Sequence, residues 1–454
     1  MPIRFTRIRF INNDRRIAQM TRDVRVNRPS LLIRLQCSLA TKLPLPLMAA
    51  TRRHLRERAI REIMASDTRR ARQLLIDVSI IARHDAGTGI QRAVRSLSLE
   101  LLKAPPPGFE VRFVHATRKQ PYRYAHAYAA ALTGATIADA SDEMDARPGD
   151  LFIGLDLASR ILPARRADLV ALQLRGVRCA FVVYDLLPAT HPAWFTKRSS
   201  SAFRKWLASL ALHADALFCI SNAVAQSTRT WFHDRYGLPA DAPSVEWFHL
   251  GANFSACTDD LARPARVVSL GEPVTLLMVG TIEPRKGHAL ALGALEILWA
   301  RGVPVRLVVV GRKGWRADDV VERLQHCEQA GHPLTWLRDG NDTMLEQQYR
   351  NAHGVLMASE AEGFGLPLVE AARYGLPVLA RNLPVFREIA GSNVEYFDAS
   401  TATAFADELA GWVEKVRAGV APDSRQIRPL TWRESAARFS ELIGNLDRTA
   451  PLAH

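Results

Sequence analysis

The sequence has no run of 18 apolar residues, so no stretch is long enough for a transmembrane helix. It has no uninterrupted apolar core of a secretory signal either, because the apolar residues 31–33 are followed at once by Arg34. Its five cysteines form no C-x-x-C pair, which predicts free thiols in a reducing compartment and argues against structural zinc. We therefore expect a cytoplasmic protein.

The net charge of +14 is concentrated at the N-terminus. Residues 1–70 hold 17 Lys and Arg against 5 Asp and Glu, a net charge of +12, and the other 384 residues carry only +2. We predict that residues 1–70 are a basic, poorly ordered tail. Such a segment is typical of a disordered arm, an RNA contact or attraction to anionic lipid. No RNA-binding motif accompanies it, so contact with an anionic membrane surface, or no function, is favoured, and we expect no nucleic-acid partner. Met48 and Met64 leave open a later start of translation.

The rest of the chain predicts an α/β fold with two parallel sheets. A length of 454 residues, 48% of them hydrophobic, is enough for two or three domains with ample cores. Short apolar runs alternate with helical patterns, as expected for sheets covered by helices on both faces. The predicted strands are residues 74–80, 110–116, 150–156, 178–185, 216–221, 245–250, 274–280, 305–311, 334–339, 353–359, 377–382 and 394–398. Ser221 is the expected N-cap of a helix.

The polar residues 254–272 lack sustained periodicity and are the predicted linker between the two domains. We place a first Rossmann-like domain at 71–253 and a second at 273–430. An amphipathic helix at 431–447 is expected to end the fold.

Residues 359–380, S-E-A-E-G-F-G-L-P-L-V-E-A-A-R-Y-G-L-P-V-L-A, predict a loop and a helix that follow a buried strand. Gly363 and Gly365 permit close backbone approach to a ligand, and the free N–H groups at the helix start near Leu366 favour phosphate. Glu362 and Glu370, eight positions apart, could each accept hydrogen bonds from the hydroxyls of a sugar. The alternative is that Glu370 only complements the helix dipole and Glu362 is a solvated loop residue.

A second loop, G-T-I-E-P-R-K-G at 280–287, follows the first predicted strand of the second domain. The first strand-to-helix turn of a doubly wound sheet commonly holds a phosphate. Arg285 can chelate two phosphate oxygens, and Lys286 supplies a point charge. Adjacent basic residues are more often solvated surface, but their pairing with the 359–380 unit favours the phosphate interpretation.

The segment E-G-F-G-L-P-L-V-E resembles the E-x7-E signature of retaining GT-B glycosyltransferases of the large family four. The resemblance covers roughly residues 74–445 and implies two facing Rossmann-like domains, with the C-terminal helix packed on the first. It implies catalytic roles for Glu362, Arg285 and Lys286. It implies nucleotide-sugar binding by Glu370, Gly363, Phe364, Gly365, Leu366 and Gly280. The sequence has no D-x-D triplet, the usual metal clamp on a diphosphate, so we expect no metal site.

The same resemblance assigns an acceptor or sugar side to the first domain. The turn H-D-A-G-T-G at 84–89 corresponds to the family's glycine loop, which implies that Gly87, Thr88 and Gly89 face the cleft. Tyr184 and Asp185 lie at the C-terminal end of the predicted strand 178–185, at the sheet edge that binds ligands. Tyr184 stands where many relatives have a histidine that contacts the sugar. The alternatives are a half-buried tyrosine and, for Asp185, a turn or helix cap.

The resemblance is strongest to bacterial mannosyl- or rhamnosyl-type transferases of O-antigen or other surface polysaccharides. It implies transfer from a nucleotide sugar, favouring GDP-mannose or a related GDP-sugar, to a glycan or lipid-linked acceptor with retention of configuration. The donor would be a substrate, and we expect no bound cofactor. Peripheral association with the inner face of the cytoplasmic membrane would follow. Two alternatives remain: a GT-B protein of other chemistry, such as an epimerase or an inactive scaffold, and a nucleic-acid-binding protein led by the basic arm.

Overall fold

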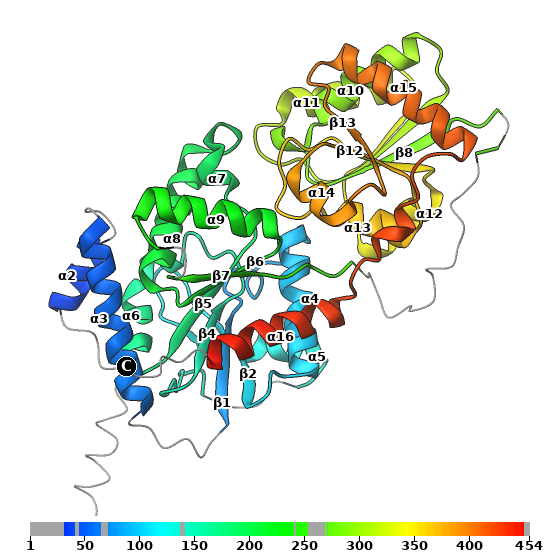
Figure 1. The fold of residues 1–454 in the computed structure, drawn as a ribbon. Coiled ribbons are helices and arrows are strands. Elements are labelled where there is room, and N and C mark those ends of the chain that lie inside the picture. Colours follow the sequence, from blue (N-terminus) through cyan, green and yellow to red (C-terminus); the bar gives the residue numbers. More distant parts are fainter. Residues whose placement is uncertain are drawn as a thin grey trace, which may run out of the picture.

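The computed structural model describes residues 31–40, 45–64, 71–136, 141–239, 242–252, 268–269 and 271–448. The predicted boundary at residue 253, most of the predicted linker and residues 1–30 lie outside this part of the chain. Within it, two α/β domains follow one another along the sequence, each built on its own sheet (Figure 1).

The first domain contains a seven-stranded sheet with the order β3-β2-β1-β4-β5-β6-β7, parallel except for β3. Its strands are β1 (Arg72–Asp77), β2 (Phe109–His115), β3 (Arg123–Tyr124), β4 (Leu151–Gly154), β5 (Arg178–Val183), β6 (Ala216–Cys219) and β7 (Ser244–Trp247). The two-residue strand β3 was missed by the sequence analysis because it is too short to show alternation. The helical elements are α4 (Gly89–Lys103), α5 (His126–Thr133), η1 (Leu162–Ala164), α6 (Arg166–Leu174), α7 (Leu187–Thr190), η2 (Pro192–Trp194), α8 (Lys197–His213) and α9 (Asn222–Tyr236).

The second domain contains a fully parallel six-stranded sheet with the order β10-β9-β8-β11-β12-β13. Its strands are β8 (Val274–Val279), β9 (Val305–Val310), β10 (Leu334–Leu337), β11 (Gly354–Met357), β12 (Val378–Arg381) and β13 (Glu395–Phe397). The helical elements are η4 (Pro284–Lys286), α10 (His288–Ala300), α11 (Asp318–Gln329), α12 (Asp342–Asn351), α13 (Leu366–Arg373), α14 (Pro384–Ala390), α15 (Ala402–Ala418) and η5 (Ser424–Ile427).

Both sheets have the strand order of a doubly wound fold, which confirms the predicted pair of Rossmann-like domains. The central strands are apolar throughout: every residue of β4, β6 and β11 is buried, because helices cover both faces of each sheet. The strand order reverses between β1 and β4 in the first sheet and between β8 and β11 in the second. Ligands of such sheets bind at these reversal points, outside the carboxyl ends of the strands.

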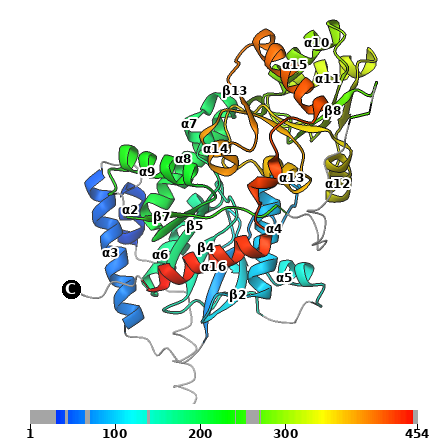
Figure 2. The same cartoon turned by 45° about the vertical axis from the view of Figure 1, so that its right-hand side comes forward.

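Helix α16 (Trp432–Arg448) returns to the first domain, where Figures 1 and 2 show it crossing one face of the sheet beside α4. Its Phe439 ring stacks on Phe248 of the first domain with ring centroids 4.7 Å apart. At its end, Asp447 forms an ion pair with Arg72 at 2.6 Å. The predicted C-terminal helix therefore joins the two domains through an apolar face and a terminal ion pair.

The structure differs from the expectation of a poorly ordered tail at α2 (Leu31–Ala40) and α3 (Leu45–Met64), which pack against the first domain. Met48, Leu55 and Ala59 recur at helical spacing and are buried, and Met48 and Leu55 join the core beneath α6 and α8. Arg52 donates to the carbonyl of Ala211 at 3.1 Å, and Arg56 pairs with an Asp of the same domain. The tail prediction is wrong for these helices because part of their positive charge is used inside the fold.

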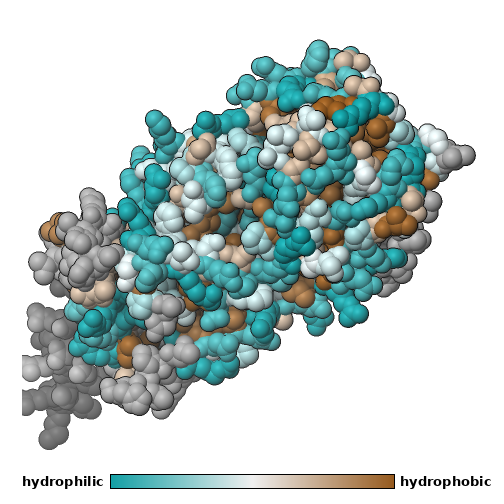
Figure 3. Space-filling model, turned by 45° about the horizontal axis from the view of Figure 1, so that its top comes forward, coloured by the Kyte–Doolittle hydropathy of each residue, from teal (hydrophilic) through white to brown (hydrophobic). Residues whose placement is uncertain are grey.

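In the part of the chain that the structure describes, no helix combines the length and apolar character needed to cross a bilayer. On the face drawn in Figure 3, hydrophilic residues dominate and hydrophobic ones are scattered among them.

Candidate active site

The loops that follow β8 and β11 meet at the reversal point of the second sheet. The loop after β8 contains η4, and its Arg285 carbonyl accepts a hydrogen bond from the N–H of Glu360 at 2.7 Å. Gly287, with φ of 71°, ends η4, and a Cβ there would lie 2.1 Å from the carbonyl oxygen of Ala358. Glycine is therefore required for the two loops to pack, and their packing brings the predicted cationic and acidic residues together.

Arg285, Lys286 and Glu362 form one ion cluster. The Glu362 carboxylate accepts from Lys286 Nζ at 2.5 Å and from an Arg285 guanidinium nitrogen at 3.1 Å. Ser359 Oγ donates to the same carboxylate at 2.7 Å, and Glu283 binds Arg285 at 2.7 Å. Sequence analysis grouped the first three residues, but it missed Ser359 and Glu283 as members of the cluster.

Electrostatics hold Glu362 ionised. Burial alone would raise the pKa of its carboxyl, but the charges of Lys286 and Arg285 outweigh burial and lower that pKa to about 2. Burial has the opposite net result at Glu283, where it raises the pKa despite the neighbouring cations. The pKa of Arg285 is raised because Glu362, Glu283 and Asp185 outweigh the effect of burial on its guanidinium. The cluster thus consists of two basic side chains, Arg285 and Lys286, held in place by carboxylates.

Glu370 lies in the middle of α13 and is buried, with 2% of its side chain exposed. One carboxylate oxygen pairs with Arg92 of α4, from the first domain, and the other accepts from the hydroxyl of Tyr349 at 2.7 Å. Arg92 also lies 3.5 Å from Asp342 at the start of α12. Neither Arg92 nor Tyr349 was singled out from the sequence, since nothing near them in the chain indicates a partner more than 20 positions away.

The glycine loop before α13 packs against the first domain. A Cβ on Gly363 would lie 1.9 Å from the Tyr184 carbonyl oxygen, so this glycine permits contact between domains. Gly365 has φ of 102° and precedes Leu366, the first residue of α13. Phe364 is 4% exposed, with its ring 5.5 Å from that of His249. Gly280, predicted with this group, lies beside the Lys286 side chain, which a Cβ would approach to 3.4 Å.

The glycine turn that precedes α4 in the first domain lies close to the glycine loop that precedes α13. Figures 1 and 2 show α4 near α13. A Cβ on Gly89 would lie 3.4 Å from Leu366 Cδ1. Thr88 is the N-cap of α4, and its hydroxyl accepts from the Gln91 N–H at 3.3 Å. Gly87 has φ of 66°, which the turn into α4 requires. The turn therefore positions α4, the helix that carries Arg92 to Glu370.

Asp185 and Tyr184 have different surroundings although they are adjacent in the chain. Burial raises the pKa of Asp185, and the nearby charge of Arg285 opposes this, so the carboxyl lies close to the ion cluster. Tyr184 is 3% exposed, and its hydroxyl donates to the carbonyl of Leu155 at 2.9 Å. The core of the first domain uses the ring and hydroxyl of Tyr184, which favours the alternative of a buried tyrosine, and the sugar contact stays a prediction.

Two further contacts join the domains beside the site. Ser221 is the N-cap of α9, as predicted, and its hydroxyl also donates to the Gly363 carbonyl at 2.7 Å. Glu388 of α14 accepts from the N–H groups of Asn222 and Ala223, each at 2.8 Å, and pairs with His249 at 2.8 Å. The start of α9 is therefore capped by a carboxylate from the other domain, which ties the two domains together beside the site. Among the described residues, no three His, Cys, Asp or Glu side chains gather as a metal site would require.

Residues 264–419 match the family model described as glycosyl transferases group 1. The chain is 37% identical over 392 residues to the serotype-specific mannosyltransferase WbdA of Escherichia coli, covering 85% of this chain and 46% of that protein. It is 34% identical over 173 residues to a phosphatidyl-myo-inositol mannosyltransferase of Mycolicibacterium smegmatis, covering 36% of this chain and 43% of the other. The chain spans about half the length of the curated relatives it matches.

Solved structures share the fold at low sequence identity. HepE of Anabaena, crystallised in complex with UDP, superposes with a TM-score of 0.56 at 17% identity, covering 82% of this chain and all of that one. A sucrose-phosphate synthase from Thermosynechococcus elongatus gives the same TM-score at 16% identity, over 83% of this chain and all of the other.

Proposed function

The chain contains a glycosyl transferases group 1 domain in a GT-B fold, and from this premise we propose that it transfers a sugar from a nucleotide-sugar donor to a glycan acceptor in surface polysaccharide synthesis. The observation that carries the proposal is the cluster of Arg285, Lys286 and Glu362 at the reversal point of the second sheet. Cations at that edge suit a diphosphate, and a carboxylate beside them suits sugar hydroxyls.

In the proposed transfer step, Arg285, Lys286 and Glu362 provide the groups that contact the donor. The bond between the anomeric carbon and the diphosphate breaks, a new bond forms to the acceptor oxygen, and the acceptor proton passes to the leaving diphosphate. Arg285 and Lys286 stabilise the negative charge that grows on the diphosphate, which is the charge that differs most between ground and transition states. Glu362 orients the sugar hydroxyls. We propose that the transfer retains the anomeric configuration and needs no metal, because these cations take the role of a metal clamp.

Glu370 is proposed to bind the ribose of the donor. Its carboxylate is bound by Arg92 and Tyr349, so ribose hydroxyls would replace the contact from Arg92, which comes from the opposite domain. Donor binding and the spacing of the two domains would then be coupled, because one carboxylate serves both.

We favour GDP-mannose or a related GDP-sugar as the donor. The support is the likeness to proteins named as mannosyltransferases, which extends over 85% of this chain for WbdA. A lipid-linked acceptor would place the protein at the inner face of the cytoplasmic membrane. There the eight Arg residues within 1–30 would each contribute about 1 kcal/mol of attraction to anionic lipid. A chain lacking residues 1–30 should then partition less into anionic vesicles, and equal partitioning would contradict the membrane proposal.

Thermal unfolding in the presence of GDP-, UDP-, ADP- and dTDP-sugars tests the donor. A ligand at a hundredfold excess over its Kd adds about 2.7 kcal/mol to the stability of the native protein, so a true donor should raise Tm clearly. A shift with one nucleotide class, unchanged by a metal chelator and followed by transfer to a mannose-containing glycan, supports the proposal. A nucleotide-dependent shift with no transfer to any glycan would favour an inactive scaffold or an epimerase.

A further inference from the structure

A second basic cavity lies in the first domain, and none of the donor-site residues described above contributes to its wall. It has a volume of about 520 Å³ and lies between η1 and the first half of α8. This volume is in the range of small-molecule sites. Five cationic side chains line the cavity: Arg118, Arg160, Arg166, Arg198 and Lys205.

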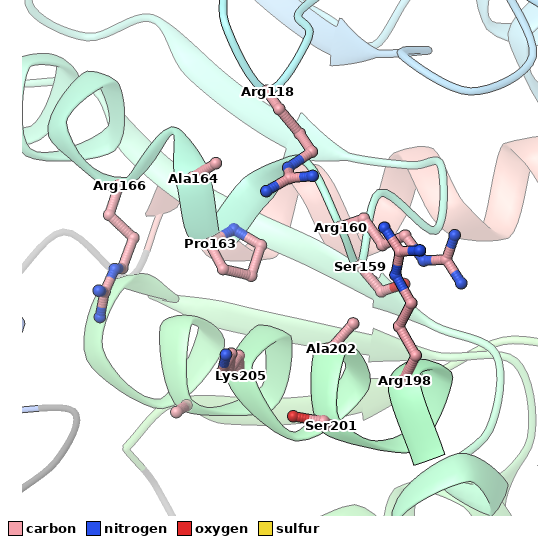
Figure 4. A pocket seen from close by; sticks show the side chains of 11 residues that line it. Arg118, Ser159, Arg160, Pro163, Ala164, Arg166, Arg198, Ser201, Ala202 and Lys205 are labelled. Atoms are coloured by element: carbon pink, nitrogen blue, oxygen red, sulfur yellow. The ribbon is translucent and has the colours of Figure 1, made fainter. Parts of the chain in front are cut away.

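The cations come from four separate segments (Figure 4). Arg118 follows β2 and Arg160 follows β4, and the carboxyl ends of these parallel strands lie at the same edge of the sheet. Arg198 and Lys205 lie on α8 seven positions apart, with Ser201 between them on the same helix face. Figure 4 shows Arg118 extending toward the cavity from above, and Arg160 and Arg198 close together at one rim.

No acidic residue lines this cavity. Within the described residues, Arg118, Arg160, Arg198 and Lys205 have no ion-pair partner, although neighbouring arginines do: Arg165 pairs with an Asp at 2.6 Å. Like charges that share one concavity repel one another, and the field they produce is focused inside it. These side chains are exposed to solvent at the rim, and an anion that enters the cavity is attracted by all of them at once.

The hydrogen-bond donors that line the cavity indicate which class of anion it would bind. Arginine forks bind phosphate oxygens two at a time, and four of the five cations are arginines. The hydroxyls of Ser159 and Ser201 add neutral donors, and Pro163, Ala164 and Ala202 supply an apolar wall. The four cations with no ion pair among the described residues exceed what one phosphate monoester can neutralise, which favours a group with two linked phosphates.

We propose that this cavity, the α8 cavity, binds a diphosphate group at a site distinct from the donor site. The group can be free in solution or joined to a lipid, and the cavity offers both the same contacts. Arg198 follows by four positions Trp194, whose carbonyl accepts from Trp315 of the second domain at 2.8 Å. The cavity thus begins four residues along the chain from an interdomain contact. The binding proposal itself does not depend on glycosyl transfer.

The test is a calorimetric titration of the full chain with inorganic diphosphate at low salt. All proteins compared carry Lys286→Met, which removes one cation of the donor site. The pocket variant adds Arg160→Gln and Arg198→Gln. The control variant adds Lys119→Gln and Arg204→Gln instead, which make the same charge change at exposed positions outside the cavity wall.

We expect the pocket variant to bind diphosphate about 30-fold more weakly, since each lost cation costs about fivefold, and the control to bind as the parent does. Among the described residues the two arginines form no ion pair, and Arg160 makes only one exposed hydrogen bond, to Ser199 at 3.3 Å, so their removal should leave Tm nearly unchanged or raised at low salt. Equal diphosphate affinity of the pocket and control variants would overturn the proposal. So would weaker binding that comes with a lower Tm of the pocket variant, because the loss would then reflect misfolding.

Vesicle sedimentation then shows whether the bound diphosphate is free in solution or joined to a lipid. Neutral phosphatidylcholine vesicles with and without a lipid diphosphate are compared for the pocket and control variants. A loss of lipid-diphosphate binding in the pocket variant alone assigns the cavity to a lipid-borne group. Equal sedimentation of both variants, together with the calorimetric loss, assigns it to a free diphosphate.

Discussion

Replacing Lys286 by Met should slow sugar transfer by more than tenfold. In the proposed function, Lys286 supplies one of two cations facing the leaving diphosphate, and its Nζ lies 2.5 Å from Glu362. A hydrogen bond to a charged group contributes about 1.5–3 kcal/mol, which corresponds to a loss of kcat of about 10- to 150-fold. Methionine keeps the length of the side chain, so the loss of charge is the main change.

The same substitution should alter the acid stability of the protein. The pKa of Glu362 is lowered from 4.5 to about 2 in the folded chain. A group with a lowered folded pKa adds stability that is fully present above about pH 4.5 and disappears as the pH falls toward 2. This contribution is about 3 kcal/mol. Without Lys286 the folded pKa of Glu362 rises, so acid unfolding should begin at a higher pH.

Two measurements test these expectations. The first is the initial rate of transfer from the donor that the thermal unfolding experiment identifies, and the second is Tm between pH 7 and pH 3. Lys415→Met is the matched control, because Lys415 forms an exposed ion pair with Glu395 far along the chain from the cluster. We expect the control to keep both the rate and the acid stability of the parent. A wild-type kcat for Lys286→Met would refute the phosphate-clamp assignment. An unchanged acid transition would refute the electrostatic account of Glu362.

Three further substitutions test the rest of the site. Glu370→Gln should weaken donor affinity at least tenfold by calorimetry. The control Glu346→Gln, whose carboxylate pairs only with Arg350 of the same helix among the described residues, should not. Equal effects of the two substitutions would remove Glu370 from the donor site. Gly363→Ala should lower Tm and widen the molecule in small-angle scattering, because its Cβ would lie 1.9 Å from the Tyr184 carbonyl; an unchanged profile would contradict the interdomain packing. Phe439→Ala should cost about 3–5 kcal/mol in denaturant unfolding, since the ring is fully buried against the first domain, and a cost below 1 kcal/mol would show that α16 is dispensable.

The elements of both sheets could be predicted because their signals are local. Buried parallel strands are short, continuous apolar runs, and the turns between them contain glycine and proline at positions that few other residues tolerate. The predicted strands coincide with β1, β2 and β4 to β13 to within a few residues. Only β3, with two residues, carried too little pattern to be found.

The N-terminal helices show where a composition argument fails. Residues 1–70 are strongly basic, and charge of one sign usually indicates a solvated segment. In α3, however, Leu55 is 1% exposed and Arg52 is 4% exposed. The net charge of the whole segment concealed the helical spacing of its few apolar residues. It also gave no sign that the first domain provides hydrogen-bond acceptors for its arginines.

The sequence by itself determined the two-domain α/β fold, the phosphate-type loop with Arg285 and Lys286, and the strand, loop and helix unit that carries Glu362 and Glu370. Each depends on the order of neighbouring residues. Only the tertiary structure decided that Arg92 reaches Glu370, that Tyr184 belongs to the core, and that cations from four segments share the α8 cavity. Such contacts join residues far apart in the chain, and their formation depends on how packed helices and facing domains meet, which local periodicity does not encode.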